Sequence, residues 1–188
     1  GRIHPLDPVS GKGTTLYEGL ICGFDVSGVD IGEKVVHEAS VYFKKFLESE
    51  KFKHSLHSER LSGENKSYRS RVYRFDFAPT KEDFKNAEKL RHLTMVAGDA
   101  RFADRYFKKN SFHLVVGDLP YGVAHGNVAG QGKPSDGRAF SSPTRNPKEL
   151  LRACLPALKK VLKPGGALAL AWNTFVLPKA QMAEVLAQ

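Results

Sequence analysis

The stretch FHLVVGDLPY, residues 112–121, decides how the rest of the chain is interpreted. Its first half is apolar and typical of a buried strand, which leads directly into Asp118. Pro120 biases Leu119 toward an extended conformation, so the Leu119 carbonyl and the Asp118 carboxylate can point the same way. Tyr121 places an aromatic ring beside them. Two acceptors and a ring in one turn suit a flat base held by its amino group. The alternative is an ordinary strand-to-loop turn.

Apolar runs that resemble this one alternate with helical patterns along the chain. The expected strands are Arg2–Leu6, Phe24–Val29, His92–Ala97, Phe112–Gly117 and Ala167–Trp172. The expected helices are Leu16–Cys22, Glu33–Glu50, Thr80–Leu90, Leu150–Leu162 and Leu177–Leu186. The fourth is expected to be kinked or broken near Pro156. Apolar strands without clear alternation suit a parallel sheet that helices cover on both faces. We therefore expect a single α/β domain over residues 1–188, a Rossmann-like, mostly parallel sheet with helices on both faces.

A glycine loop, residues 7–15, follows the first expected strand. Gly11 and Gly13 lack a Cβ, so the backbone can turn sharply and let a ligand approach the unpaired N–H groups of the next helix. Lys12 lies between them and is not followed by Ser or Thr, so the spacing of a phosphate-binding P-loop is not met. The candidate cofactor-binding residues of this loop are Asp7, Pro8, Gly11, Gly13 and Thr14.

Acidic residues follow successive expected strands. Asp30 ends the second strand, where dinucleotide folds place an acid that accepts hydrogen bonds from both ribose hydroxyls. A helix-capping acid is the alternative for this residue. Asp99 follows the third strand and Asp118 the fourth. Because open α/β sheets bind ligands at the carboxyl ends of their strands, we expect these acids at one binding edge.

These motifs together resemble one known family. Asp118-Leu119-Pro120-Tyr121 resembles the (Asp/Asn)-Pro-Pro-Tyr motif of class I S-adenosylmethionine-dependent methyltransferases that modify exocyclic amines of nucleobases, with Leu119 in place of the commoner proline. The glycine loop resembles motif I of the same enzymes, with Lys12 in place of a small residue. The Asp-Leu-Pro-Tyr-Gly form looks closest to THUMP-associated tRNA guanine-N2 methyltransferases.

The resemblance implies a cofactor, S-adenosyl-L-methionine, and roles for the residues. It places Asp30 with Ile31 and Asp99 with Ala100 around the cofactor, with Asp99 taking the adenine amino group. A structural acid or a cap for Arg101–Lys108 is the alternative for Asp99. Asp118 would border both the cofactor and the base. The resemblance makes the turn catalytic through Asp118, Leu119, Pro120 and Tyr121.

Residues 51–79 have few apolar residues and are expected to be a basic insertion, in which Ser67–Phe77 alternates well enough to be a strand or ribbon. Basic side chains here interleave with aromatic ones at Tyr68, Tyr73, Phe75 and Phe77. Arg beside exposed aromatic rings suits an RNA backbone with stacked bases, and a solvated loop is the alternative. The candidate RNA-binding residues are Arg69, Arg71 and Arg74. His54 and His57 lack further ligands of the right kind, so no metal is expected.

Residues 122–145 contain many glycines and almost no apolar periodicity. We expect a glycine-rich lid loop beside the site, in which Lys133 and Arg138 contact RNA phosphates. An idle loop is the alternative.

The composition limits the class of protein. Lys and Arg number 29 against 20 Asp and Glu, which gives a formal net charge of +9. This charge favours a polyanionic partner such as tRNA, and a merely basic soluble protein is the alternative. Cys22 and Cys154 are too few for a disulfide framework, sit in apolar contexts suited to buried thiols, and favour a reducing, cytoplasmic location. No signal peptide and no membrane-spanning apolar run is visible.

The chain looks like the catalytic domain of a longer protein. Its first strand begins at the N-terminus, and nothing after the fifth strand supplies the closing hairpin usual in this superfold. An N-terminal RNA-binding domain is the expected missing part. The expected function is methyl transfer to guanine N2 in tRNA, a step of tRNA processing. The alternatives are an adenine-N6 DNA or RNA methyltransferase and a catalytically inactive cofactor- or RNA-binding subunit.

Overall fold

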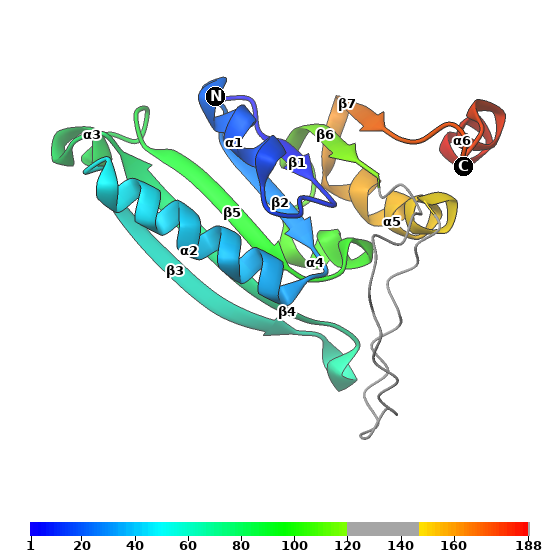
Figure 1. The fold of residues 1–188 in the computed structure, drawn as a ribbon, viewed down its shortest axis with the longest axis horizontal. Coiled ribbons are helices and arrows are strands. Elements are labelled where there is room, and N and C mark those ends of the chain that lie inside the picture. Colours follow the sequence, from blue (N-terminus) through cyan, green and yellow to red (C-terminus); the bar gives the residue numbers. More distant parts are fainter. Residues whose placement is uncertain (120–146, 188) are drawn as a thin grey trace.

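A computed structural model describes residues 1–119 and 147–187, which form one mixed sheet with helices on both faces (Figure 1). The strands among these residues are β1 (Pro5–Asp7), β2 (Val26–Asp30), β3 (Lys53–Ser62), β4 (Arg69–Ala78), β5 (Arg91–Ala97), β6 (Phe112–Asp118) and β7 (Leu162–Ala171). Their order across the sheet is β3-β4-β5-β2-β1-β6-β7. Neighbours from β5 to β7 are parallel, whereas β4 runs antiparallel to β5 and to β3.

The parallel part of the sheet confirms the expected fold class. Its strands are the ones that the apolar runs predict, and β1 lies between β2 and β6. This is the order of a Rossmann-like doubly wound sheet, in which the connections reverse direction beside the first strand. Ligands of such sheets bind at this reversal, outside the carboxyl ends of the strands.

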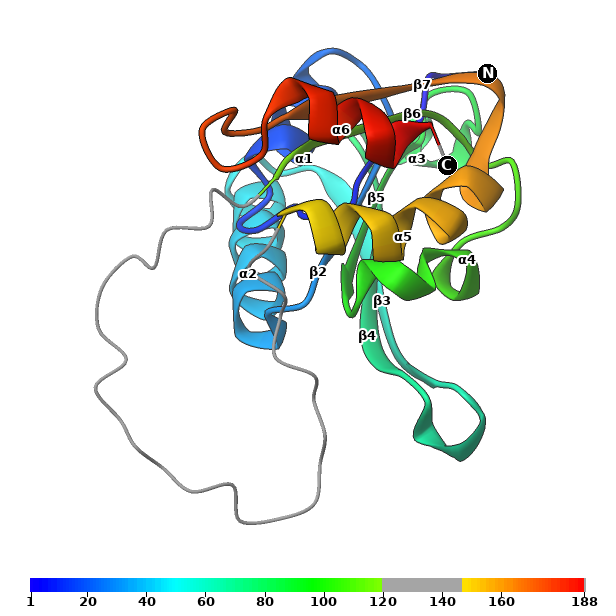
Figure 2. The same ribbon diagram turned by 90° about the vertical axis from the view of Figure 1, so that its right-hand side faces the viewer.

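Helices cover both faces of the sheet (Figure 2). The helices on one face are α1 (Thr14–Ile21) and α2 (Glu33–Ser49), and those on the other are α4 (Ala103–Tyr106) and α5 (Pro147–Val161). A third buried cluster joins α5 to α6 (Lys179–Leu186). The remaining short helices are η1 (Glu64–Lys66), α3 (Lys81–Lys85) and η2 (Ala100–Phe102). Phe43 of α2 shows why this helix lies where it does, because its ring meets Phe75 and Phe77 edge-on at 5.1 and 5.3 Å.

Residues 51–79 belong to the sheet as its antiparallel edge. Strands β3 and β4 pair along their whole length, and β4 joins β5. The alternative of a solvated loop is therefore wrong for both strands. Tyr73, Phe75 and Phe77 are buried under α2. The expectation that these rings stand exposed beside arginines is wrong, because every second residue of β4 faces the core.

Three local expectations differ from the structure. Helix α3 ends at Lys85, short of the expected Leu90, because the Asn86 side chain accepts the N–H of Glu88 at 3.0 Å and starts a turn. Helix α5 continues through Pro156 without a break. Cys22 is exposed, although Cys154 is buried as expected. None of the helices described is long and apolar enough to cross a lipid bilayer.

Candidate ligand site at the carboxyl edge of the sheet

The four acids that follow parallel strands lie at one edge of the sheet. Asp7, Asp30 and Asp118 are the last residues of β1, β2 and β6, and Asp99 follows β5. The first three are close enough for their charges to interact, since those of Asp30 and Asp118 both raise the pKa of Asp7. The edge therefore concentrates negative charge at the reversal point of the fold.

Asp7 is buried under the glycine loop and holds the start of this loop by a hydrogen bond. It is 3% exposed, and its Oδ1 accepts the N–H of Val9 at 2.9 Å. Burial is the main cause that raises the pKa of Asp7, while hydrogen bonds from Val9 and the Thr15 side chain lower it. Pro8 is buried as well. Both residues thus act on the loop conformation, whereas Thr14 is exposed.

Asp30 connects the glycine loop to the start of α2. Its Oδ2 accepts the N–H of Gly11 at 2.9 Å, and its Oδ1 accepts the N–H of Gly32 at 2.8 Å. Gly11 and Gly13 have φ angles of 51° and 93°, a left-handed conformation that favours glycine. A carboxylate oxygen has two lone pairs, so each oxygen of Asp30 can accept one further hydrogen bond.

Gly28 lets the glycine loop lie directly on β2. A Cβ at this position would come within 2.7 Å of the side chains of Leu16 and Ser10. The Ser10 N–H also donates to the Val29 carbonyl at 2.9 Å. Sequence reasoning did not single out Gly28, because a glycine inside a strand carries no sign of what approaches it.

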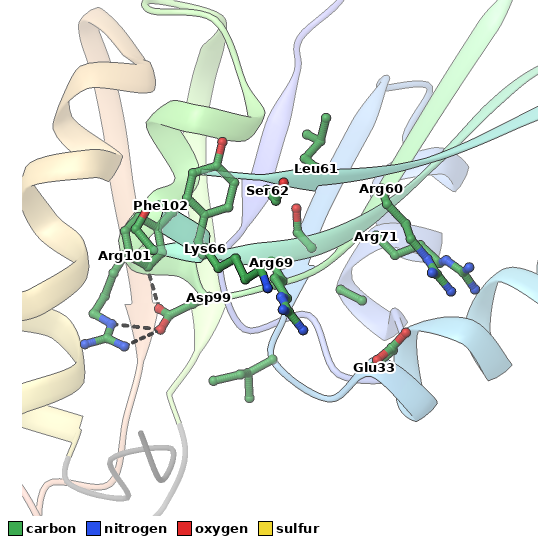
Figure 3. Close-up of a pocket in the computed structure, with 16 residues that line it drawn as sticks. Glu33, Arg60, Leu61, Ser62, Lys66, Arg69, Arg71, Asp99, Arg101 and Phe102 are labelled. Carbon is green, nitrogen blue, oxygen red and sulfur yellow. Dashed lines mark hydrogen bonds and ion pairs between the residues drawn. The ribbon is translucent and has the colours of Figure 1, made fainter. Parts of the chain in front are cut away.

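Asp99 caps η2 and forms an ion pair with Arg101. Its Oδ1 accepts the Arg101 N–H at 2.9 Å, and its Oδ2 accepts from Nε and Nη2 of Arg101 at 2.8 and 2.6 Å (Figure 3). Ala100 is buried beside it. The alternative of a capping acid is thus what the structure shows for Asp99, and the contact with adenine stays a prediction.

A pocket of about 850 Å³ lies between the parallel strand ends and the β3–β4 hairpin. Its apolar wall includes Ile31, Ala97 and Phe102, and Gly98 and Asp99 form part of its floor. The hairpin supplies the opposite wall with residues from both strands and from η1 (Figure 3). Sequence reasoning missed the contribution of Phe102, for which the chain carries no motif.

The turn after β6 is held by backbone and side-chain contacts at Leu119. Its N–H donates to the Ala171 carbonyl of β7 at 2.9 Å. Its side chain is buried in a cluster with Leu151, Leu177, Met182 and Val185. Asp118, one residue earlier, is exposed. Pro120, Tyr121, Lys133, Arg138 and the expected lid over 122–145 lie outside the described residues.

The three expected RNA-binding arginines do not form one patch. Arg69 and Arg71 are on one face of β4, whereas Arg74 is on the other, because side chains alternate along a strand. Arg74 forms an ion pair there with Glu59 of β3. Arg69 and Arg71 instead line the pocket, together with Arg60 and Lys66.

Comparisons with known proteins add little to this geometry. No family model matches the chain, and no curated protein matches its sequence. The fold is similar to the crystal structure of the PH0226 protein from Pyrococcus horikoshii OT3, at 18% identity and a TM-score of 0.46 over all of this chain. The match covers 53% of that protein, so this chain spans about half its length. At this distance the likeness says nothing about ligand or reaction.

Proposed function

We propose that this chain is an S-adenosylmethionine-dependent methyltransferase that acts on an exocyclic amine of a nucleobase in RNA, with guanine N2 in tRNA as its substrate. The proposal is supported above all by the placement of the glycine loop, Asp30 and Asp118 at neighbouring strand ends beside the reversal point of the sheet. The motif at residues 118–121 gives the amine-directed chemistry.

The residues present fit the proposed cofactor. Apart from the neighbours of Gly11 in the chain, no atom of the described residues lies within 4 Å of the position that a Cβ would take there, so these residues leave room for a ligand to approach the loop. Asp30 is fixed by two backbone N–H groups and retains acceptor capacity for ribose hydroxyls. The pocket wall at Ile31, Ala97 and Phe102 suits a flat adenine ring. When bound, the cofactor supplies an electrophilic methyl group.

The turn after β6 would orient the amine. An exocyclic amine on a base is a poor nucleophile, because its lone pair is delocalised into the ring. Asp118 and the Leu119 carbonyl can accept its two hydrogens, which favours a pyramidal nitrogen and stabilises the positive charge that develops on it. The bond from the Leu119 N–H to β7 fixes the backbone of this turn in advance. The proton leaves to Asp118 or to water.

Methyl transfer to tRNA by the full-length protein, followed by digestion to nucleosides, tests this role. We expect Asp118→Ala to lose roughly a hundredfold to a thousandfold in turnover, the effect of deleting one preorganised polar group. Asp118→Asn keeps one acceptor oxygen, so its turnover should lie between that of the wild type and that of Asp118→Ala. Cofactor affinity should stay near that of the wild type, and Glu38→Gln, an exposed acid on α2, serves as the control.

Three outcomes would change the proposal. Full activity of Asp118→Ala would refute the catalytic role. Methylated adenine as the sole product would keep the mechanism and move the substrate to adenine N6. Cofactor binding without transfer to any nucleic acid would identify an inactive subunit.

A further inference from the structure

The β3–β4 hairpin extends past the ligand edge of the sheet. Pairing between β4 and β5 begins at Arg71, opposite Ala97, whereas β3 and β4 stay paired as far as Ser62 and Arg69. The end of the hairpin therefore reaches beyond the last residue of β5, as Figure 2 shows. A ligand bound in the pocket at the strand ends therefore lies next to the side of this hairpin.

Four cations at the base and along the side of this extension line the same pocket. Arg60 and Arg71 are paired across the two strands, so their side chains share one face and point toward the start of α2 (Figure 3). Arg69 lies further along the same face, and Lys66 belongs to η1 at the turn. We call Arg60, Lys66, Arg69 and Arg71 the basic groove.

The basic groove lacks counter-charges of its own. Within the described residues, none of its four side chains has an ion pair or a side-chain hydrogen bond, and the buried Nε of Arg71 has no partner. Asp99, which also lines the pocket, is bound to Arg101. Glu33 is then one acid facing four cations. Like charges placed together without partners favour binding of an anion.

The backbone of the turn is strained in a way that positions Lys66. Asn65 and Lys66 have φ angles of 50° and 59°, so two successive residues other than glycine are left-handed. Asn tolerates this conformation, whereas a lysine there is uncommon, and such residues cluster at binding sites. Backbone bonds hold the turn, with the Lys66 N–H on the Gly63 carbonyl at 3.0 Å and the Gly63 N–H on the Tyr68 carbonyl at 3.1 Å.

We propose that the basic groove binds the phosphate backbone of the RNA substrate, at a fixed distance from the reacting base. This inference rests on the proposed function. The cofactor itself carries no phosphate, so it leaves these cations unused. Arg60, Lys66 and Arg69 are exposed along an open groove, which suits an extended polyanion better than an enclosed small anion. Guanidinium groups bind phosphate oxygens in pairs.

The sheet fixes the distance between the groove and the reacting base. Strands β5, β2 and β1 lie between β4 and β6, and neighbouring strands are about 4.8 Å apart, so the backbones of β4 and β6 are about 19 Å apart across the sheet. A stacked strand rises about 3.4 Å per nucleotide, so the groove would hold phosphates about five or six nucleotides from the methylated base. An RNA shorter than this cannot reach both positions.

Fluorescence anisotropy of labelled tRNA with the full-length protein, without cofactor and over a range of salt concentrations, tests the inference. The variant Arg69→Gln/Arg71→Gln should bind about tenfold more weakly or worse, because two charge-assisted contacts are lost. Its slope of log affinity against log salt should fall by about 1.4, or about 0.7 for each phosphate contact. The loss should be the same for unrelated RNA sequences, since phosphates carry no sequence information.

Arg74→Gln is the matched control, because it removes the same side chain from the opposite face of the same strand. It should bind RNA as the wild type does. Lys66→Asn is a second test, which removes a charge while Asn tolerates the left-handed conformation. It should weaken binding without loss of thermal stability.

Several results would overturn the inference. It fails if wild-type protein does not bind RNA, if Arg74→Gln weakens binding as much as the double variant does, or if the double variant binds normally. Full displacement of tRNA by inorganic phosphate at comparable concentration would indicate a small-anion site instead. Methyl transfer is measured separately, so hairpin-dependent RNA binding without transfer would refute the proposed function and leave the groove standing. Normal methyl transfer by the wild type, together with unchanged RNA binding by the double variant, would support the proposed function and refute the basic groove.

Discussion

Replacing Asp30 by asparagine tests the support of the glycine loop more sharply than alanine does. Each carboxylate oxygen accepts a different backbone N–H, from Gly11 at 2.9 Å and from Gly32 at 2.8 Å. Asparagine has one oxygen, so it can satisfy one of these donors while its NH2 group faces the other. The substitution is nearly equal in size, and it still removes one acceptor that the structure uses.

The expected loss of stability follows from these two bonds. A hydrogen bond to a charged group contributes about 1.5–3 kcal/mol, and an unpaired buried donor costs about 1–3 kcal/mol. Because Asp30 is only partly buried, water replaces part of what is lost, and we expect a total of about 1–3 kcal/mol. In a domain of this size that lowers Tm by roughly 2–12 °C.

Urea unfolding without ligand measures how much Asp30 contributes to the free energy of unfolding. Calorimetric titration with S-adenosylmethionine measures the affinity for the cofactor. Glu38→Gln removes one exposed charge from α2 and is the control for net charge. The variant Asp30→Asn should be less stable than Glu38→Gln and should bind the cofactor weakly. Equal stability of the two variants would refute the two-acceptor account. Lower stability with unchanged affinity would separate Asp30 from the cofactor site.

Two further predictions concern the same loop. Gly28→Ala should cost about 1–3 kcal/mol in urea unfolding and weaken cofactor binding, because the new Cβ would meet Leu16 and Ser10 at 2.7 Å; unchanged stability would contradict the close approach. Asp7→Asn should gain stability relative to wild type as the pH rises. Burial raises the pKa of Asp7 in the folded state, so wild type loses stability from the ordinary pKa of 3.8 up to the raised value, and the variant does not. Unfolding at a series of pH values measures this gain, and a difference independent of pH would contradict it.

The parallel half of the fold could be predicted because its strands are rich in apolar residues, and β1, β2 and β5 inside the sheet are mostly buried. Phe112–Gly117 and His92–Ala97 are mostly apolar, and each run leads to an acid that marks its carboxyl end. The acids at those ends then follow in the right order. Strand β3 carried no such signal, since it lies at the sheet edge with most of its side chains exposed.

The division of the basic residues follows once β4 is a strand. Arg69 and Arg71 are two residues apart and share a face, whereas Arg74 falls on the other, and grouping the three by charge alone overlooked this period. Asp99 is different, because the sequence left the ligand contact and the cap both open. The structure shows which residues contact each other, and the sequence pattern does not. At Gly28, for example, it shows the close approach of Leu16 and Ser10.

The position of β1 has a consequence for the order of folding. This short strand lies inside the sheet between β2 and β6, yet its Pro5 pairs with Leu114, which is far away in the sequence. The hairpin of β3 and β4, by contrast, closes between neighbours in sequence. Non-local pairing forms slowly because a long loop must close first, so the hairpin should form early and the β1–β6 seam late. The basic groove on the hairpin would then form before β1 and β6 bring the glycine loop beside Asp118.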